Sequence, residues 1–123
     1  GQSPLAGSGF YLMDVPVDHW VESVTGLGAT GVEIILSHVG EHPLQGHPMV
    51  PLLQVASDPG MMARYGGDID LGVDCGGAVD EDEGAYQLLA LVMETASRRH
   101  VPRVVELRNT DFQLTRGLLG VSL

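Results

Sequence analysis

The sequence predicts a single α/β domain with a mostly parallel sheet flanked by helices, in a Rossmann-like three-layer arrangement. The first observation is the length of 123 residues, which is typical of one domain. The second is a pair of short apolar runs, Phe10–Met13 and Val32–Leu36, separated by a segment of helix length. A strand, a helix and a second strand in this order form a parallel, right-handed unit. The third is a long amphipathic segment, Ala85–Arg99, which can cover one face of a sheet.

The first half of the chain supplies most of the predicted sheet. We expect a helix over His19–Ala29 that ends at Gly31, a residue suited to the position after a helix. Gly26 and Gly28 weaken this helix, so its backbone is expected to pack closely against a strand. Val50–Val55 is the third predicted strand.

The second half adds helices and shorter strands. Asp58 and Pro59 are a suitable cap and first residue for a short helix. Asp68–Gly77 alternates acidic and apolar residues before it turns to glycine, which predicts a short strand. Arg103–Leu107 is a further predicted strand, and Asn109–Phe112 a turn. The helix over Ala85–Arg99 is expected to pack on the sheet through an apolar stripe made of Leu88, Leu89, Leu91, Val92 and Ala96.

Charge and cysteine content exclude several classes of protein. The net charge is -10, with six Lys and Arg against sixteen Asp and Glu, so a nucleic-acid partner is not expected. Cys75 is the only cysteine, which excludes an internal disulfide and fits a reducing, cytoplasmic setting. No apolar stretch reaches the roughly 20 residues of a membrane span, so no membrane partner is expected.

Residues 1–9 have the composition of a linker, rich in glycine, serine and proline. We interpret them as a domain boundary, with residues 10–123 as the folded domain. The chain is therefore expected to be one piece of a longer protein with upstream domains.

The candidate site follows from the rule that ligands bind beyond the carboxyl ends of strands in α/β sheets. Asp14 and the polar loop from Ser37 to Pro48 occupy such positions, and the loop carries four ligand-type side chains, His38, Glu41, His42 and His47. Residues 38–42 also read as H-x-x-E-H, the inverted zincin pattern, which requires a helix. Gly40 and Pro43 oppose a helix there, so we reject a metalloprotease. A metal or substrate site on the loop, a solvated loop and a partner-contacting loop remain open.

Acidic residues further along the chain offer oxygen ligands. Asp68, Asp70 and Asp74 could serve a divalent ion, although their spacing does not match an EF-hand. We favour a turn with one important carboxylate, Asp70. Cys75 lies among glycines, and we interpret it as structural.

An ordered set of segments resembles the C-terminal domain of the altronate/galactarate dehydratase family, which includes sulfolactate lyase large subunits. The similar segments cover nearly the whole chain and keep the family's order. They are Gly9–Pro16, Glu22–Gly26, Ala29–Gly31, Val50–Asp58, Asp68–Asp70, Asn109–Phe112 and Gly120–Leu123.

The resemblance implies dehydration of a sugar acid by an enzyme that depends on a divalent metal, often iron, and that has upstream domains. His38 or His42 is then the candidate acid or base, with Ser37 and Asp14 as orienting groups. The candidate metal ligands are Glu41, His47 and Asp70.

One departure from the family pattern supports an alternative. The family typically has Phe-Thr-Thr-Gly-Arg-Gly where this chain has Leu36–Glu41, so a hydroxyl remains at Ser37 but the arginine is lost. The alternative is a non-catalytic domain for assembly or ligand binding. In either case the apolar tail Leu114–Leu123 predicts self-association or a surface that another domain covers.

Overall fold

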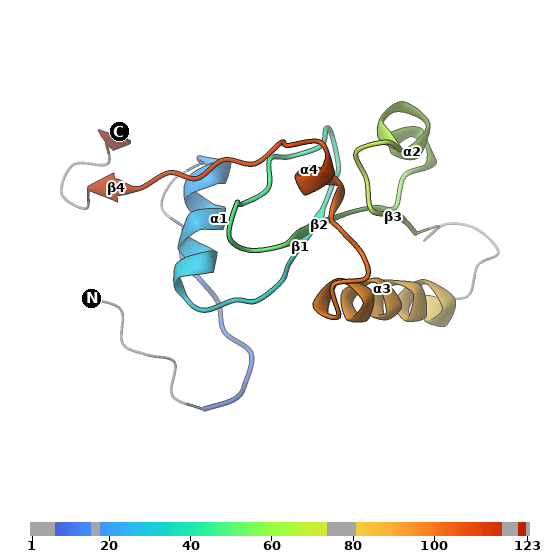
Figure 1. Cartoon of the computed structure of the whole chain (residues 1–123), viewed down its shortest axis with the longest axis horizontal. Coiled ribbons are helices and arrows are strands. Elements are labelled where there is room, and N and C mark those ends of the chain that lie inside the picture. Colours follow the sequence, from blue (N-terminus) through green and yellow to red (C-terminus); the bar gives the residue numbers. More distant parts are fainter. Residues whose placement is uncertain (1–6, 16–17, 74–80, 117–120, 123) are drawn as a thin grey trace.

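The computed structural model describes residues 7–15, 18–73, 81–116 and 121–122, and it confirms the α/β class (Figure 1). Three strands form one sheet in the order β1-β2-β3, and both pairings are parallel. Two further strands, β4 and β5, form a separate antiparallel pair. In chain order the elements are α1 (Trp20–Ala29), β1 (Ile35–His38), β2 (Leu52–Ala56), α2 (Pro59–Tyr65), β3 (Leu71–Gly72), α3 (Glu81–Ala96), α4 (Arg103–Glu106), β4 (Thr115–Arg116) and β5 (Val121–Ser122).

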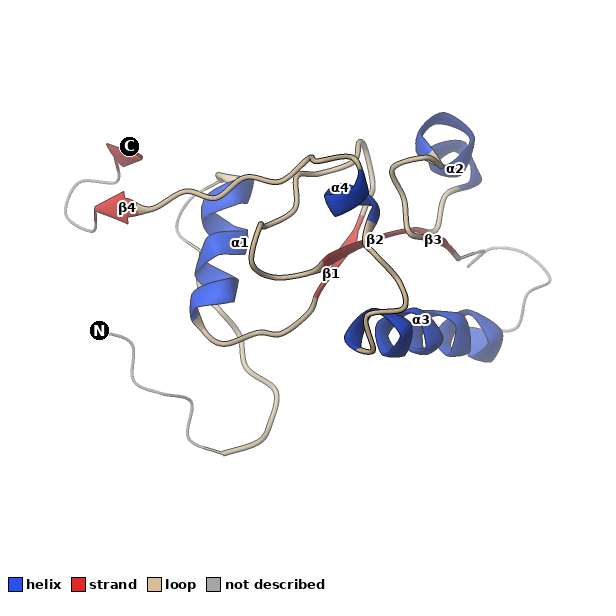
Figure 2. Ribbon diagram, viewed as in Figure 1, coloured by secondary structure: helices blue, strands red, loops and turns tan. Residues whose placement is uncertain are grey.

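The main core lies on the face of the sheet that α1 and α4 cover. Side chains alternate along β1, so Ile35 is buried and pairs in register with Leu52 of β2. Val24 of α1 and Val104 of α4 close over these two strands. Figure 2 shows α3 on the other side of the sheet from α4. No described helix combines the length and the apolar character needed to cross a membrane.

Helix boundaries in the first half follow the expected signals. The Asp58 carboxylate accepts a 2.8 Å hydrogen bond from the backbone N–H of Gly60, and Pro59 begins α2. Gly31 follows α1 with a φ of +90°, in the left-handed region that favours glycine. A Cβ on Gly28 would lie 3.2 Å from Val50, so the expected close packing is present, against the segment just before β2.

The predicted strand over Phe10–Met13 is wrong. This segment has no regular structure, and the side chains of Phe10 and Leu12 are 89% and 87% exposed. Strand propensity depends on a partner strand, and here the segment runs beside α1, where Met13 lies near Gly26. The parallel sheet is instead built from β1, β2 and β3, which begin later than the sequence suggests.

The predicted strand over Arg103–Leu107 is also wrong, because this segment forms the short helix α4. Pro102 directly precedes the first helical residue, where its missing N–H costs nothing. Arg103 and Glu106 form a 2.9 Å ion pair one helical turn apart, and Val104 is buried against the sheet.

The predicted apolar stripe of the long helix is wrong in part. Helix α3 begins and ends earlier than expected, and the side chain of Leu89 is 58% exposed. Small or polar residues, Gly84 and Thr95, are buried in its place, and Thr95 donates a hydrogen bond to Leu91 within the helix. A Cβ on Gly84 would lie only 2.7 Å from Val73, so the helix approaches the end of β3 through its glycine. Of the predicted short strand over Asp68–Gly77, only Leu71–Gly72 forms β3, and residues 74–77 lie outside the described part of the chain.

Candidate functional site

The carboxyl ends of β1, β2 and β3 meet at one edge of the sheet, because the three strands are parallel. A pocket of about 310 Å³ opens at this edge between the ends of β2 and β3 and the start of α2. We call it the strand-end pocket. Its lining residues are Ala56, Ser57, Asp58, Pro59, Met62, Gly72 and Val73.

A histidine and a serine meet beside the strand-end pocket. The Nε2 atom of His38 lies 2.9 Å from the hydroxyl of Ser57, and the His38 ring is exposed. His38 ends β1 opposite Val55 of β2, and Ser57 lies two residues after Val55, directly beyond the end of β2. The period of two along a strand therefore puts Ser57 on the same face as His38. This pair combines a titratable ring with a hydroxyl at the expected edge.

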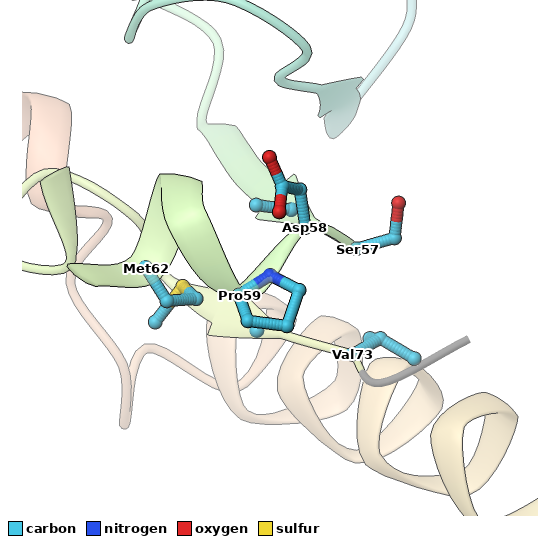
Figure 3. Close-up of a pocket in the computed structure, with 7 residues that line it drawn as sticks. Ser57, Asp58, Pro59, Met62 and Val73 are labelled. Atoms are coloured by element: carbon cyan, nitrogen blue, oxygen red, sulfur yellow. The ribbon is translucent and has the colours of Figure 1, made fainter. Parts of the chain in front are cut away.

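The walls of the strand-end pocket are mostly apolar (Figure 3). Pro59, Met62 and Val73 form the apolar part, and the Ser57 hydroxyl and the Asp58 carboxylate point to one side of it. None of the described lining residues is cationic. A substrate carboxylate at this edge therefore needs a positive group from elsewhere.

The other residues of the predicted catalytic set are placed differently. Ser37 is buried on the opposite face of β1 from His38, as alternation along the strand requires. His42 is exposed in the loop that follows β1, at the same edge as His38. Asp14 is exposed in the segment that runs beside α1. The structure therefore brings Ser57, rather than Ser37 or Asp14, to the His38 ring.

The loop after β1 has an exposed first part and a firmly held second part. The backbone N–H of Leu44 donates to the side-chain oxygen of the buried Gln54, and the Trp20 indole N–H donates to the backbone carbonyl of Gln45 at 2.7 Å. Gly46 accepts a hydrogen bond from Asp111. The titratable side chains of the first part are thus the ones free to meet a ligand.

The Asp70 carboxylate is fully buried and satisfied by three donors. One oxygen accepts from the backbone N–H of Gln54 at 2.8 Å. The other accepts from the backbone N–H of Arg103 and contacts Nε2 of His100, both at 2.9 Å. These bonds connect the start of β3 with three other parts of the chain, which are β2, the segment after α3 and the start of α4. The carboxylate oxygens are therefore engaged within the protein.

His47 lies apart from both Asp70 and His38. Its Nδ1 atom accepts a 3.2 Å hydrogen bond from the backbone N–H of Met49, and its ring makes an edge-on contact with Phe112. An acceptor at Nδ1 implies that the ring proton lies on Nε2. A metal ion binds an unprotonated nitrogen, and the unprotonated nitrogen of His47 is engaged by the N–H of Met49 in this conformation.

The predicted metal ligands are not assembled into one centre. Within the described residues, no group of three His, Cys, Asp or Glu side chains could hold an ion. Glu41 is exposed in the loop, while hydrogen bonds engage both oxygens of Asp70 and the Nδ1 atom of His47. The described donor set does not fit a divalent metal. Cys75 and Asp74 lie outside the described residues.

Ser57 is the site residue that the sequence prediction missed. It lies two residues after the end of the third predicted strand, so the strand-end rule that selected His38 could also have selected it. The contact itself joins residues 19 positions apart and depends on the register of β1 and β2.

A comparison with known protein families gives a match over most of the chain. The family described as D-galactarate/altronate dehydratase, C-terminal, matches residues 1–118. The comparisons with curated proteins and with solved structures gave no match.

Proposed function

Because this chain belongs to the family of D-galactarate/altronate dehydratase C-terminal domains, we propose that it acts in a sugar-acid dehydratase that removes water from a hydroxy acid. The family match over residues 1–118 is the main support. The His38–Ser57 pair at the carboxyl edge of a parallel sheet adds a place where the chemistry fits.

In the proposed reaction, His38 takes the proton on the carbon next to the substrate carboxylate. The electron pair of the broken C–H bond forms a carbon–carbon double bond, while the C–O bond to the hydroxyl on the neighbouring carbon breaks. The histidine gives its proton to this hydroxyl, which leaves as water. Ser57 contacts Nε2, so we assign the proton transfer to Nδ1. The hydrogen bond to Ser57 holds the ring at the strand edge.

The proposed enzyme needs further groups for the substrate carboxylate. The described lining of the strand-end pocket has no cation, and the chain carries a net charge of -10. We therefore propose that another domain of the parent protein supplies the positive group, and that the chain alone binds sugar acids weakly.

The test is the dehydration of altronate and of galactarate by the full-length protein. We expect His38→Ala to lower the turnover rate by at least about 100-fold, the usual contribution of a general base. The matched control is His19→Ala, because His19 is exposed before α1 and its side chain makes no capping bond. His42→Ala tests the second exposed histidine of the loop.

Retained activity in the His38→Ala/His42→Ala double variant would remove the acid and base assignment. A second function is favoured by the missing cation and the lost family arginine: a non-catalytic domain for assembly or ligand binding. It predicts that the His38→Ala protein turns over both sugar acids at the wild-type rate, while deletion of the whole domain disrupts assembly.

A further inference from the structure

We infer that a second ligand site lies at the amino ends of the strands, in a cavity that takes an apolar molecule with one uncharged hydrogen-bond acceptor, such as an aryl ketone. The cavity has a volume of about 770 Å³ and lies between α1, the segment before β2 and the segment after α4. Its volume falls within the range of small-molecule pockets. It shares no lining residue with the strand-end pocket, so the inference is independent of the proposed dehydration.

The wall of this cavity is almost entirely apolar. Val50 forms part of the buried side, and Phe112 contributes an aromatic ring. Met49 and Leu114 line the cavity as well and are 86% and 68% exposed, so they lie at its rim. A methionine at a rim adapts to ligands of different shape, because its side chain is unbranched and flexible. These walls favour an apolar body in the ligand.

One polar group on the wall has unused hydrogen-bonding capacity. The His47 side chain lines the cavity and is only 7% exposed. The bond from the Met49 N–H to Nδ1 directs the ring proton to Nε2. Among the described residues, Nε2 of His47 has no hydrogen-bond partner. Because no buried side-chain nitrogen or oxygen of the described residues lacks a partner, this N–H is accessible from the cavity and can donate to an acceptor on a bound ligand.

The other polar side chains nearby are already satisfied. The Thr25 hydroxyl donates to the carbonyl of Val21 at 2.7 Å and accepts from the N–H of Gln113 at 3.2 Å. The His47 N–H is therefore the donor that a ligand with one acceptor can use here. An uncharged acceptor is favoured over an anion, because the walls are apolar and the chain has a net charge of -10. A carbonyl on an apolar body meets these requirements.

The test is a titration of this chain with acetophenone and with ethylbenzene, which has the same shape without the carbonyl. Binding is followed by the NMR signals of the Met49 methyl group and the Phe112 ring. We expect saturable shifts with both probes, and a roughly three- to tenfold stronger response to acetophenone, the ratio that one neutral hydrogen bond gives. Acetophenone should also shift the ¹⁵N signal of His47 Nε2, while Nδ1 keeps the shift of an unprotonated nitrogen.

Two variants complete the experiment. His47→Phe keeps a ring in place and removes the donor, so the preference for acetophenone should fall below about twofold. Ser57→Ala, in the strand-end pocket, should leave both titrations unchanged. Absence of saturable shifts with either probe, equal responses in the wild type, or a preference that survives in His47→Phe would overturn the inference. The ¹⁵N measurement is made on the wild type, so it tests the inference even if His47→Phe does not fold.

Discussion

At the scale of single residues, the buried carboxylate of Asp70 has the largest structural role among the predicted site residues. Its two oxygens meet two backbone N–H groups and the ring of His100. A buried carboxylate with three donors is favourable, whereas removal of its charge or of one acceptor leaves donors without partners. The side chain thus serves the fold rather than a bound ion.

We expect Asp70→Asn to lower the free energy of unfolding by roughly 3 kcal/mol, because the new amide places a donor against a donor. The measurement is urea unfolding of the wild type and the variant. The matched control is Asp68→Asn, since among the described residues Asp68 accepts a bond through its backbone carbonyl, from Gln54, and none through its side chain. This control should stay within about 0.5 kcal/mol of the wild type. Equal stability of the Asp70→Asn protein would contradict the structural role.

Gly46 gives a second residue-scale prediction. A Cβ at this position would lie 2.6 Å from a methyl group of Val104, which is itself only 2% exposed. Gly46→Ala should therefore destabilise the protein by about 1–3 kcal/mol through overpacking. Gly40→Ala is the control, because nothing lies within 4 Å of the corresponding Cβ. Thermal unfolding of both variants tests the difference, and a Gly46→Ala protein as stable as Gly40→Ala would refute it.

At the scale of elements, three helices end in the same way but on different residues. Gly31, Arg98 and Arg108 each follow a helix with a positive φ. After α3, the N–H of Arg98 bonds to the carbonyl of Thr95, and the N–H of Arg99 bonds to that of Glu94. These two bonds define a Schellman motif, in which glycine is the usual left-handed residue.

Arg98→Gly should raise the free energy of unfolding by up to about 1 kcal/mol, since glycine removes the left-handed strain but adds freedom to the unfolded chain. Arg98→Ala is the matched control, because it removes the same charge and keeps the Cβ. The quantity to compare is the difference in urea midpoint between these two variants. A glycine variant no more stable than the alanine variant would show that the φ of 58° costs little here.

The same helix ends show how far the sequence could predict the elements. Gly31 and the Asp58–Pro59 pair carry recognised local signals, and both predictions were confirmed. Arginine carries no signal for a left-handed stop, so the predicted helix ran on past Arg98. Phe10–Met13 has strand propensity but no partner strand, and propensity alone does not form a strand. The sequence was enough to predict the sheet edge at which His38 lies. The contact between His38 and Ser57 could not be predicted, because it depends on the register of the strands.

At the scale of the whole molecule, the described surface carries apolar side chains on the outer face of α3. Tyr86, Leu89 and Met93 are 69%, 58% and 55% exposed. Their spacing of three and four residues places them on one stripe of the helix. Exposed apolar stripes of this kind commonly mark contact surfaces, so we propose the α3 stripe as a contact surface in addition to the apolar tail.

We expect the chain to associate as its concentration rises, with the α3 stripe in the contact. Sedimentation velocity over a range of concentrations measures this association. Leu89→Glu/Met93→Glu should shift the protein to monomer, because each change places a charge in an apolar contact. Leu107→Glu is the control, since Leu107 is similarly exposed, at 53%, but lies after α4. A wild type that stays monomeric at every concentration would exclude self-association through this stripe.

The hydrogen bonds of Asp70 also have a consequence for synthesis on the ribosome. Its partners lie 16, 30 and 33 residues away along the chain, and the most distant of them is Arg103. A nascent chain released only as far as α3 can pair β2 with β3, yet one oxygen of this carboxylate then still lacks its donors. Burial of Asp70 must therefore wait until Arg103 has left the ribosomal tunnel. The part of the domain from β2 to α4 is therefore expected to complete its fold only after Arg103 has emerged.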